Sequence, residues 1–341
     1  MNQYQIFKTQ QGSLEQQTAD IKQQLDSWLH DNRLTADDLR YCKVFLSDIL
    51  NQYDTLKASP LYRDCLAMRP CTIIEQAPAD GSKIALLAEA GHNDDGFRFQ
   101  SLRLNDDEAQ GVSSYLQTLT LFERYIQSLK GTDMSIRDNL VRTWIYVADI
   151  DVNYDGVVQA RNDVFRRYGL TADTHYVAST GIGGYSETRH ATVAIDFLSL
   201  PGVEPNQLKY LQALDHLNPT HEYGVAFERG TRLTLPNREI YYISGTASID
   251  KQGQVLYLGD VERQTARLLD NIRALLADGE AQMSDIRYFV VYLRDFADRK
   301  TVGRYLDSHH PGIPYVLLHA KVCRPQWLVE MECMAEKDME Q

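Results

Sequence analysis

Residues 260–296 read DVERQTARLLDNIRALLADGEAQMSDIRYFVVYLRDF, and this segment contains the clearest secondary-structure pattern of the chain. Leucine and isoleucine recur at steps of three and four between Thr265 and Ala277, a spacing typical of an amphipathic helix. The run from Ile286 to Leu293 is rich in β-branched and aromatic residues, which indicates a strand ending just before Asp295. The stretch therefore predicts a helix followed by a strand.

The same plan occurs three times along the chain. The dipeptide Gln-Thr opens each predicted helix, and each helix leads to an apolar strand that ends at an aspartate. The Gln-to-Asp separations are 31, 32 and 31 residues, for the pairs Gln17 and Asp48, Gln117 and Asp149, and Gln264 and Asp295. A second helical segment and a pair of strands follow each aspartate. Three matches in register indicate an internal repeat of roughly 100 residues, an ordinary domain size.

The repeat divides the chain into three units and predicts an α+β fold. Residues 1–92 form a first, truncated unit, whose opening strands are expected to be missing or much shortened because Gln17 lies close to the start of the sequence. Residues 93–200 form the second unit, and residues 201–222 form a connector. Residues 223–341 form the complete C-terminal unit.

Composition limits the classes of function. The formal net charge of −12 argues against binding to nucleic acid, which requires a basic face. Five cysteines at irregular spacing form neither a metal motif nor a disulfide framework. The sequence has no run of about 18 apolar residues and no N-terminal apolar segment, so we expect a soluble, cytoplasmic protein without a membrane partner. No phosphate-binding loop, dinucleotide fingerprint or metal-ligand cluster indicates a cofactor.

Two glutamates near the C-terminus stand out in an apolar strand. Glu330 and Glu332 alternate with Val329, Met331 and Cys333, so both carboxyl groups should lie on one face. Glutamate is rarely buried unless it is paired. The pair is therefore either part of a catalytic site, or part of an exposed sheet face or of salt bridges at a seam between units.

Four further stretches carry a resemblance to a known family. They are Arg142-Thr143-Trp144-Ile145-Tyr146 with Arg161, Thr180-Gly181-Ile182-Gly183, Phe227-Glu228-Arg229-Gly230 with residues 244–249, and Cys323-Arg324-Pro325 running into residues 328–332. With the strand–strand–helix–strand–helix–strand–strand order, they resemble the RidA/YjgF (endoribonuclease L-PSP-like) superfamily. Within it the three-unit length is similar to that of the chorismatases.

The resemblance implies both an architecture and an assembly. Members of the superfamily are small α+β subunits with a chorismate mutase-like topology that form trimers with ligand clefts between neighbouring subunits. This chain resembles such a trimer written into one polypeptide, with three units around a barrel-like core and the helices outside. We therefore expect a monomer that acts as a pseudo-trimer, although a dimer through an exposed edge strand is compatible with it.

The implied function is hydrolysis or elimination of chorismate, or of a close cyclic enol-ether carboxylic acid, with release of pyruvate. Protonating the enol ether requires a carboxyl with a raised pKa, for which Glu332 is slightly preferred over Glu330. The alternatives are a non-catalytic protein that binds small anions, and an imine or enamine hydrolase. Ile145, where asparagine is more usual, departs from the chorismatase pattern, as do residues 250–252. Apolar residues at Val316 and Leu317, where the deaminases place an arginine, count against the imine hydrolase.

A small anionic carboxylate substrate requires cationic side chains around its carboxylates. From the residues alone, the arginines could equally be solvated or lie along an aromatic stripe. Residues 179–184 could form a hairpin turn or a cradle of backbone N–H groups. Cys323 is interpreted as a wall residue, because no histidine base accompanies it in sequence. The resemblance implies substrate binding by Arg142, Tyr146, Arg161, Gly181, Gly183, Arg229, Thr246, Cys323 and Arg324, beside the catalytic Glu332 and Glu330, with no metal.

Overall fold

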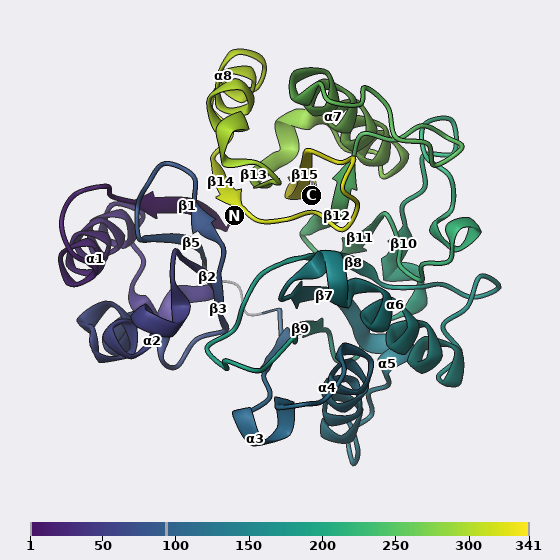
Figure 1. Cartoon of the computed structure of the whole chain (residues 1–341), viewed down its shortest axis with the longest axis horizontal. Helices are drawn as coiled ribbons and strands as arrows, with labels where there is room; N and C mark the ends of the chain where they lie inside the picture. Colours follow the sequence, from purple (N-terminus) through teal and green to yellow (C-terminus); the bar gives the residue numbers. More distant parts are fainter. Residues whose placement is uncertain (1, 93–94, 340–341) are drawn as a thin grey trace.

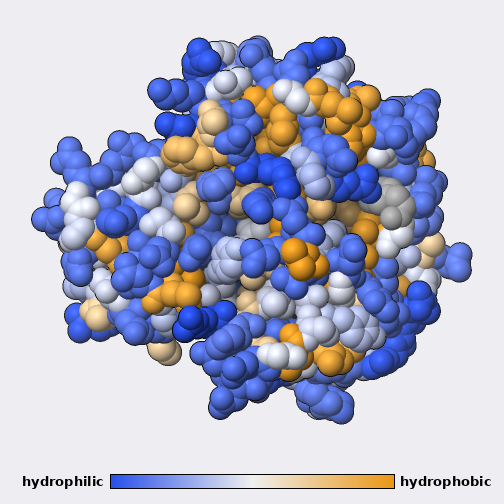
Figure 2. Space-filling view, in the orientation of Figure 1, coloured by the Kyte–Doolittle hydropathy of each residue, from blue (hydrophilic) through white to orange (hydrophobic). Residues whose placement is uncertain are grey.

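Three lobes surround a common centre in the computed structural model, which describes residues 2–92 and 95–339 (Figure 1). In each lobe the strands lie toward the centre and the long helices lie at the periphery. Hydrophilic side chains cover most of the outer surface in this view, and an apolar area lies over the third lobe (Figure 2). The predicted three-unit α+β arrangement with outer helices is confirmed.

The first lobe contains one four-stranded sheet in the order β1-β5-β2-β3. β2 and β3 are parallel, and the other pairs are antiparallel. A π-helical turn, Leu61–Leu66, extends the second helix region. Its elements are β1 (Gln3–Lys8), α1 (Leu14–Asp31), β2 (Leu39–Leu46), α2 (Ile49–Ala58), β3 (Cys71–Glu75), β4 (Ala77–Pro78) and β5 (Ile84–Ala90).

The second lobe repeats this sheet in the order β6-β9-β7-β8, again with one parallel pair, β7 and β8. Its elements are β6 (Arg98–Leu102), α3 (Asp106–Ala109), α4 (Ser114–Ser128), α5 (Ile136–Asn139), β7 (Leu140–Val147), α6 (Ile150–Arg167), β8 (Ala178–Gly183) and β9 (Val193–Ser199).

The third lobe carries a seven-stranded sheet in the order β10-β11-β12-β15-β13-β14-β4, which includes β4 of the first lobe. Its own elements are β10 (Leu208–Tyr210), β11 (Gly230–Thr234), β12 (Arg238–Ala247), α7 (Val261–Asp278), β13 (Ile286–Leu293), α8 (Arg299–His309), β14 (Tyr315–His319) and β15 (Val329–Asp338).

The helix predicted from the opening stretch is α7. Asp260 caps it by accepting a hydrogen bond from the backbone N–H of Arg263 at 3.0 Å. Its apolar stripe, which includes Leu268, Ile272 and Leu275, is completely buried, and the helix packs on β12 and β15. Burial of this stripe against the sheet stabilises the lobe, because apolar surface is removed from water.

Each lobe is joined to the next by a short contact between strand edges. Glu75 at the end of β3 bridges Tyr185, Ile182 in β8 bridges Val322, and β14 pairs with β4. The three contacts run in the same direction around the centre. Across the described residues the strands form three linked sheets around the centre. The barrel-like core predicted from sequence therefore consists of three sheets, which do not close into one barrel.

Two local predictions need correction. Residues 179–184 do not form a turn, because most of them belong to β8. Gly183 in this strand lies so close to the segment after β14 that a Cβ there would be 2.8 Å from the carbonyl oxygen of Lys321. The first lobe keeps one opening strand, β1, where the third has β11 and β12. The predicted boundary between the first two units falls next to residues 93–94, outside the described residues, and the unit boundaries stay predictions.

Candidate active site

β15 carries both glutamates into the interior. It lies between β12 and β13 in the sheet, and alternation along the strand places Glu330 and Glu332 on the same face. Each is only 4% exposed, so an exposed sheet face is excluded. Their hydrogen-bond partners nevertheless differ.

Glu332 lies in a network of ion pairs at the meeting point of the three lobes. Its carboxylate accepts hydrogen bonds from Arg142 Nη2 at 2.9 Å, Trp144 Nε1 at 3.1 Å and Lys43 Nζ at 3.4 Å. Burial alone would raise the pKa of Glu332, but the charges of Lys43 and Arg142 outweigh it and hold the pKa below its ordinary value. Glu332 is therefore a carboxylate at neutral pH.

Arg142 holds this network together. It donates to Thr180 Oγ1 at 2.5 Å and to Ser244 Oγ at 3.1 Å, in addition to Glu332. Lys43 was missed by the sequence analysis, although a lysine within the apolar run of β2 is a signal of a buried partner. Burial lowers the pKa of Lys43, and the Glu332 charge opposes this effect.

Glu330 faces a different environment. Burial raises its pKa to about 8, with a further contribution from the negative charge of Glu332, while Arg142 and Arg229 act in the opposite direction. Glu330 is therefore a protonated acid at neutral pH. A side chain at Gly245 would overlap Glu330 Oε1, so only glycine leaves room for the carboxyl in this position.

The same register position can be compared in all three sheets. Strands β2, β7 and β13 each end two positions before the repeated aspartate, and their last residues pair with the first residues of β5, β9 and β15. The second residue of these antiparallel partners is Ala85 in β5, Ala194 in β9 and Glu330 in β15. Among the three described sheets, the third alone has a carboxyl here.

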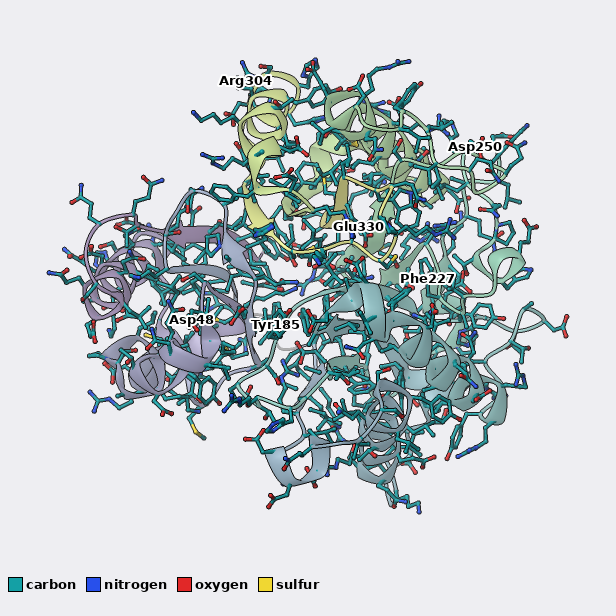
Figure 3. The ribbon with its side chains drawn as sticks, in the orientation of Figure 1. Asp48, Tyr185, Phe227, Asp250, Arg304 and Glu330 are labelled. Carbon is teal, nitrogen blue, oxygen red and sulfur yellow. The ribbon has the colours of Figure 1, made fainter. Side chains whose placement is uncertain are left out.

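An inner cavity of about 50 Å³ opens beside Glu330. It lies between the second and third lobes, where Glu330 and Phe227 are labelled in Figure 3. Its walls bring together five of the residues that were predicted from sequence, which come from α6, β8, the segment before β11, the loop after β14, and β15. These five are Arg161, Gly181, Arg229, Cys323 and Glu330.

Two buried arginines give this cavity a positive character. Arg161 is 2% exposed and Arg229 is 6% exposed. Their guanidinium carbons lie 5.8 and 5.5 Å from the ring centroid of Phe227. Arg229 Nη2 also donates to the carbonyl oxygen of Asn218 at 3.0 Å. Guanidinium groups in this setting suit the binding of a carboxylate.

An outer cavity of about 600 Å³ adjoins the inner one, and Phe227 and Arg229 line both. The connector contributes Tyr210 and His221 to its wall, and the second lobe contributes His175, whose ring stacks on Tyr210 at 4.4 Å. The sequence analysis missed this outer cavity, because its wall is assembled from segments without a motif.

The remaining predicted residues do not line the inner cavity. Tyr146 is buried in the core, with Lys43 Nζ 5.2 Å from its ring centroid. The Thr246 hydroxyl donates to the carbonyl oxygen of Ser244, and the backbone N–H of Gly183 donates to the carbonyl oxygen of Lys321. Arg324 lies over the ring of Trp327 at 4.8 Å, beside the inner cavity.

Two side chains of the inner cavity, Glu330 and Cys323, stay protonated at neutral pH. Burial raises the pKa of the Cys323 thiol, and the neighbouring Glu330 adds to the effect, so the thiol stays protonated. No group of three metal-ligating side chains occurs within residues 2–92 and 95–339. In the same part of the chain, no helix combines the length and apolar character needed to cross a membrane.

Comparison with known proteins shows relatives of part of the chain and of its fold. Residues 227–337 match the model of the endoribonuclease L-PSP family. A crystal structure of a chorismatase is 20% identical and superposes with a TM-score of 0.68, covering 98% of both chains. A putative endoribonuclease L-PSP from Entamoeba histolytica is 17% identical and covers 38% of this chain and 98% of its own, with a TM-score of 0.33.

A curated relative matches over a shorter region. The 3-aminoacrylate deaminase RutC of Acinetobacter baylyi is 28% identical over 72 residues, which is 21% of this chain and 57% of the relative. The match thus spans little more than half of that protein. Residues 227–337 therefore match the endoribonuclease L-PSP family, and the chain as a whole shares the fold of a chorismatase.

Proposed function

We propose that this protein hydrolyses chorismate, or a close cyclic enol-ether carboxylic acid, and releases pyruvate, with Glu330 as the general acid. The observation that carries the proposal is a buried carboxyl whose pKa is about 8, facing a cavity walled by two buried arginines. The likeness to the fold of a chorismatase supports the same assignment.

The reaction begins with transfer of the Glu330 proton to the methylene carbon of the enol ether. The ether carbon becomes an oxocarbenium ion, which the newly formed Glu330 carboxylate stabilises electrostatically. Water adds to this carbon and returns a proton to Glu330, so the acid is regenerated. The resulting hemiketal collapses with cleavage of the carbon–oxygen bond, which gives pyruvate and a ring alcohol. Elimination from the ring to a hydroxybenzoate would use the same residues.

Glu332 has a different role in this proposal. Its carboxylate is already neutralised by Lys43 and Arg142, so it has no proton to transfer at neutral pH. Its negative charge raises the pKa of Glu330, which keeps the acid protonated. We therefore assign Glu330 as the acid and Glu332 as a positioning residue, which reverses the slight preference for Glu332 drawn from sequence.

Arg161 and Arg229 would hold the substrate carboxylates. The inner cavity of about 50 Å³ is smaller than the roughly 150 Å³ that holds one benzene ring, so it accommodates only the reacting end of the substrate. The ring would extend into the outer cavity, which shares Arg229 and Phe227 with the inner one. Enclosure of the enol-ether group in the inner cavity strengthens the electrostatic interactions there.

The direct test incubates the purified chain with chorismate and follows pyruvate through a coupled dehydrogenase. We expect pyruvate release that depends on the protein, with mass spectrometry of the second product separating hydrolysis from elimination. Saturable binding of chorismate without pyruvate release would overturn the proposal and favour a non-catalytic anion-binding protein.

A further inference from the structure

We propose that the cleft between the third and first lobes is a second, non-catalytic site that binds a small dianion. This cleft has a volume of about 540 Å³ and lies along α8, β14 and β4. Figure 3 shows Arg304, one of its residues, on α8, remote from Glu330 and Phe227.

The sheet registers show that this cleft is the counterpart of the candidate active site. Ile182 in β8 bridges Val322, and the corresponding residue of β14, Leu318, pairs with Pro78. Pro78 is thus equivalent to Val322, and Ala79, which lines this cleft, is equivalent to Cys323.

The opposite wall corresponds in the same way. Ala247 pairs with Glu330 across β12 and β15, and Lys8 pairs with Ala85 across β1 and β5. Lys8 lines this cleft as Ala247 lines the inner cavity. The position of the acid is taken by Ala85, so this cleft has no counterpart of Glu330.

Helices α6 and α8 correspond in the same way. Tyr154 and Arg161 line the inner cavity from α6, five and twelve residues after Asp149. Lys300 and Asp307 line the second cleft from α8, five and twelve residues after Asp295. The two clefts are therefore related by the rotation that relates the lobes, but their side chains differ in charge.

The charge of the second cleft favours an anion. Four cationic side chains line it against two acidic ones, a surplus of two positive charges on a chain whose net charge is −12. Both acidic residues already have partners: Asp80 pairs with Lys8 at 3.5 Å, and Asp307 accepts a hydrogen bond from the Tyr315 hydroxyl at 2.8 Å. The cationic residues are Lys8, Arg299, Lys300 and Arg304.

This arrangement defines the chemical class of the ligand. Arginine and lysine side chains on α8 can bind two negative charges, carried by one phosphate group or by two carboxylates. Without an acid at Ala85, the bound anion cannot be protonated as the proposed mechanism requires at Glu330. The cleft would therefore bind its ligand unchanged.

The test titrates the full chain with inorganic phosphate and with malonate by isothermal calorimetry, at constant ionic strength set with sodium chloride. We expect at least one of the two dianions to bind saturably at a site that persists in Arg161→Gln, apart from any binding to the inner cavity, and the comparison shows which source of charge is preferred. The double variant Lys300→Gln/Arg304→Gln should weaken that binding by about tenfold or more. Arg137→Gln, which removes a half-exposed arginine from α5, is the matched control and should bind as the parent does.

A third variant separates this site from the candidate active site. Arg161→Gln should leave binding to the second cleft unchanged, because Arg161 lines the inner cavity. Thermal unfolding of each variant checks that the fold is retained, and the α8 substitutions are at exposed positions. The proposal is overturned if neither dianion binds saturably, if the α8 variant binds as tightly as the parent, or if Arg161→Gln abolishes the binding.

Discussion

At the scale of single residues, the two glutamates of β15 lie two positions apart but have pKa values shifted in opposite directions. Glu330→Gln preserves the volume of the side chain and removes the transferable proton. We expect kcat for pyruvate release to fall by about 100-fold or more, as loss of a general acid commonly causes. Binding of the substrate, measured by calorimetry, should change little because the arginines remain. A Glu330→Gln enzyme that turned over at the parent rate would make this strand structural.

The pH dependence of the rate is a second prediction about these residues. Glu330 must be protonated to act, so kcat/KM should decline as pH rises through about 8, the pKa of that carboxyl in the unliganded protein. Glu332→Gln removes a neighbouring negative charge and leaves Lys43 and Arg142 without their carboxylate, and both changes lower the pKa of Glu330. The decline should therefore move to lower pH in Glu332→Gln. An unchanged profile would show that Glu332 does not act on Glu330.

Gly245 provides a third prediction. An alanine Cβ there would overlap Glu330 Oε1, so Gly245→Ala should displace the acid and lower kcat. Gly245 lies in β12 and is not among the residues of positive φ, so the backbone accepts alanine. Gly303→Ala is the control, since its Cβ would meet Leu317 at an ordinary 3.5 Å. Equal rates for both variants would mean that the Glu330 position is not needed for turnover.

At the scale of elements, α7 shows how the repeat is stabilised. Ile272 is completely buried between α7 and its sheet, so Ile272→Ala should lower the free energy of unfolding by about 2–5 kcal/mol. Its neighbour Arg273 has a half-exposed side chain, and Arg273→Ala should change the free energy by no more than about 0.5 kcal/mol. Urea unfolding of both variants measures the difference. Similar values would show that α7 does not depend on its apolar stripe.

At the scale of the whole molecule, the three lobes close a ring within one chain through the contacts of β3, β8 and β14. No second copy is needed to complete that ring, so light scattering should give a mass near the 39.0 kDa of one chain. A dimer through an exposed edge strand such as β6 remains compatible with this organisation. A stable homotrimer in solution would contradict it.

Much of this organisation follows from local sequence patterns. The 3.6-residue period of α7 and the apolar run of β13 can be read along the chain, because each depends on neighbours within a few positions. The repeat then extends the assignment to the other lobes. The structure of β8 could not be read in this way: its glycines are typical of a turn, and only the neighbouring strands and the Lys321 backbone make it a strand.

The alternation of side chains along β15 is visible in the sequence, and it is enough to place Glu330 and Glu332 on one face of the strand. Which of the two is ionised depends on contacts that form only in the folded chain. Lys43 lies 289 residues from Glu332 along the chain and Arg142 lies 190 residues away, yet both bind its carboxylate. A pKa depends on burial and on the distances between charges, and these distances exist only once the three lobes have packed together.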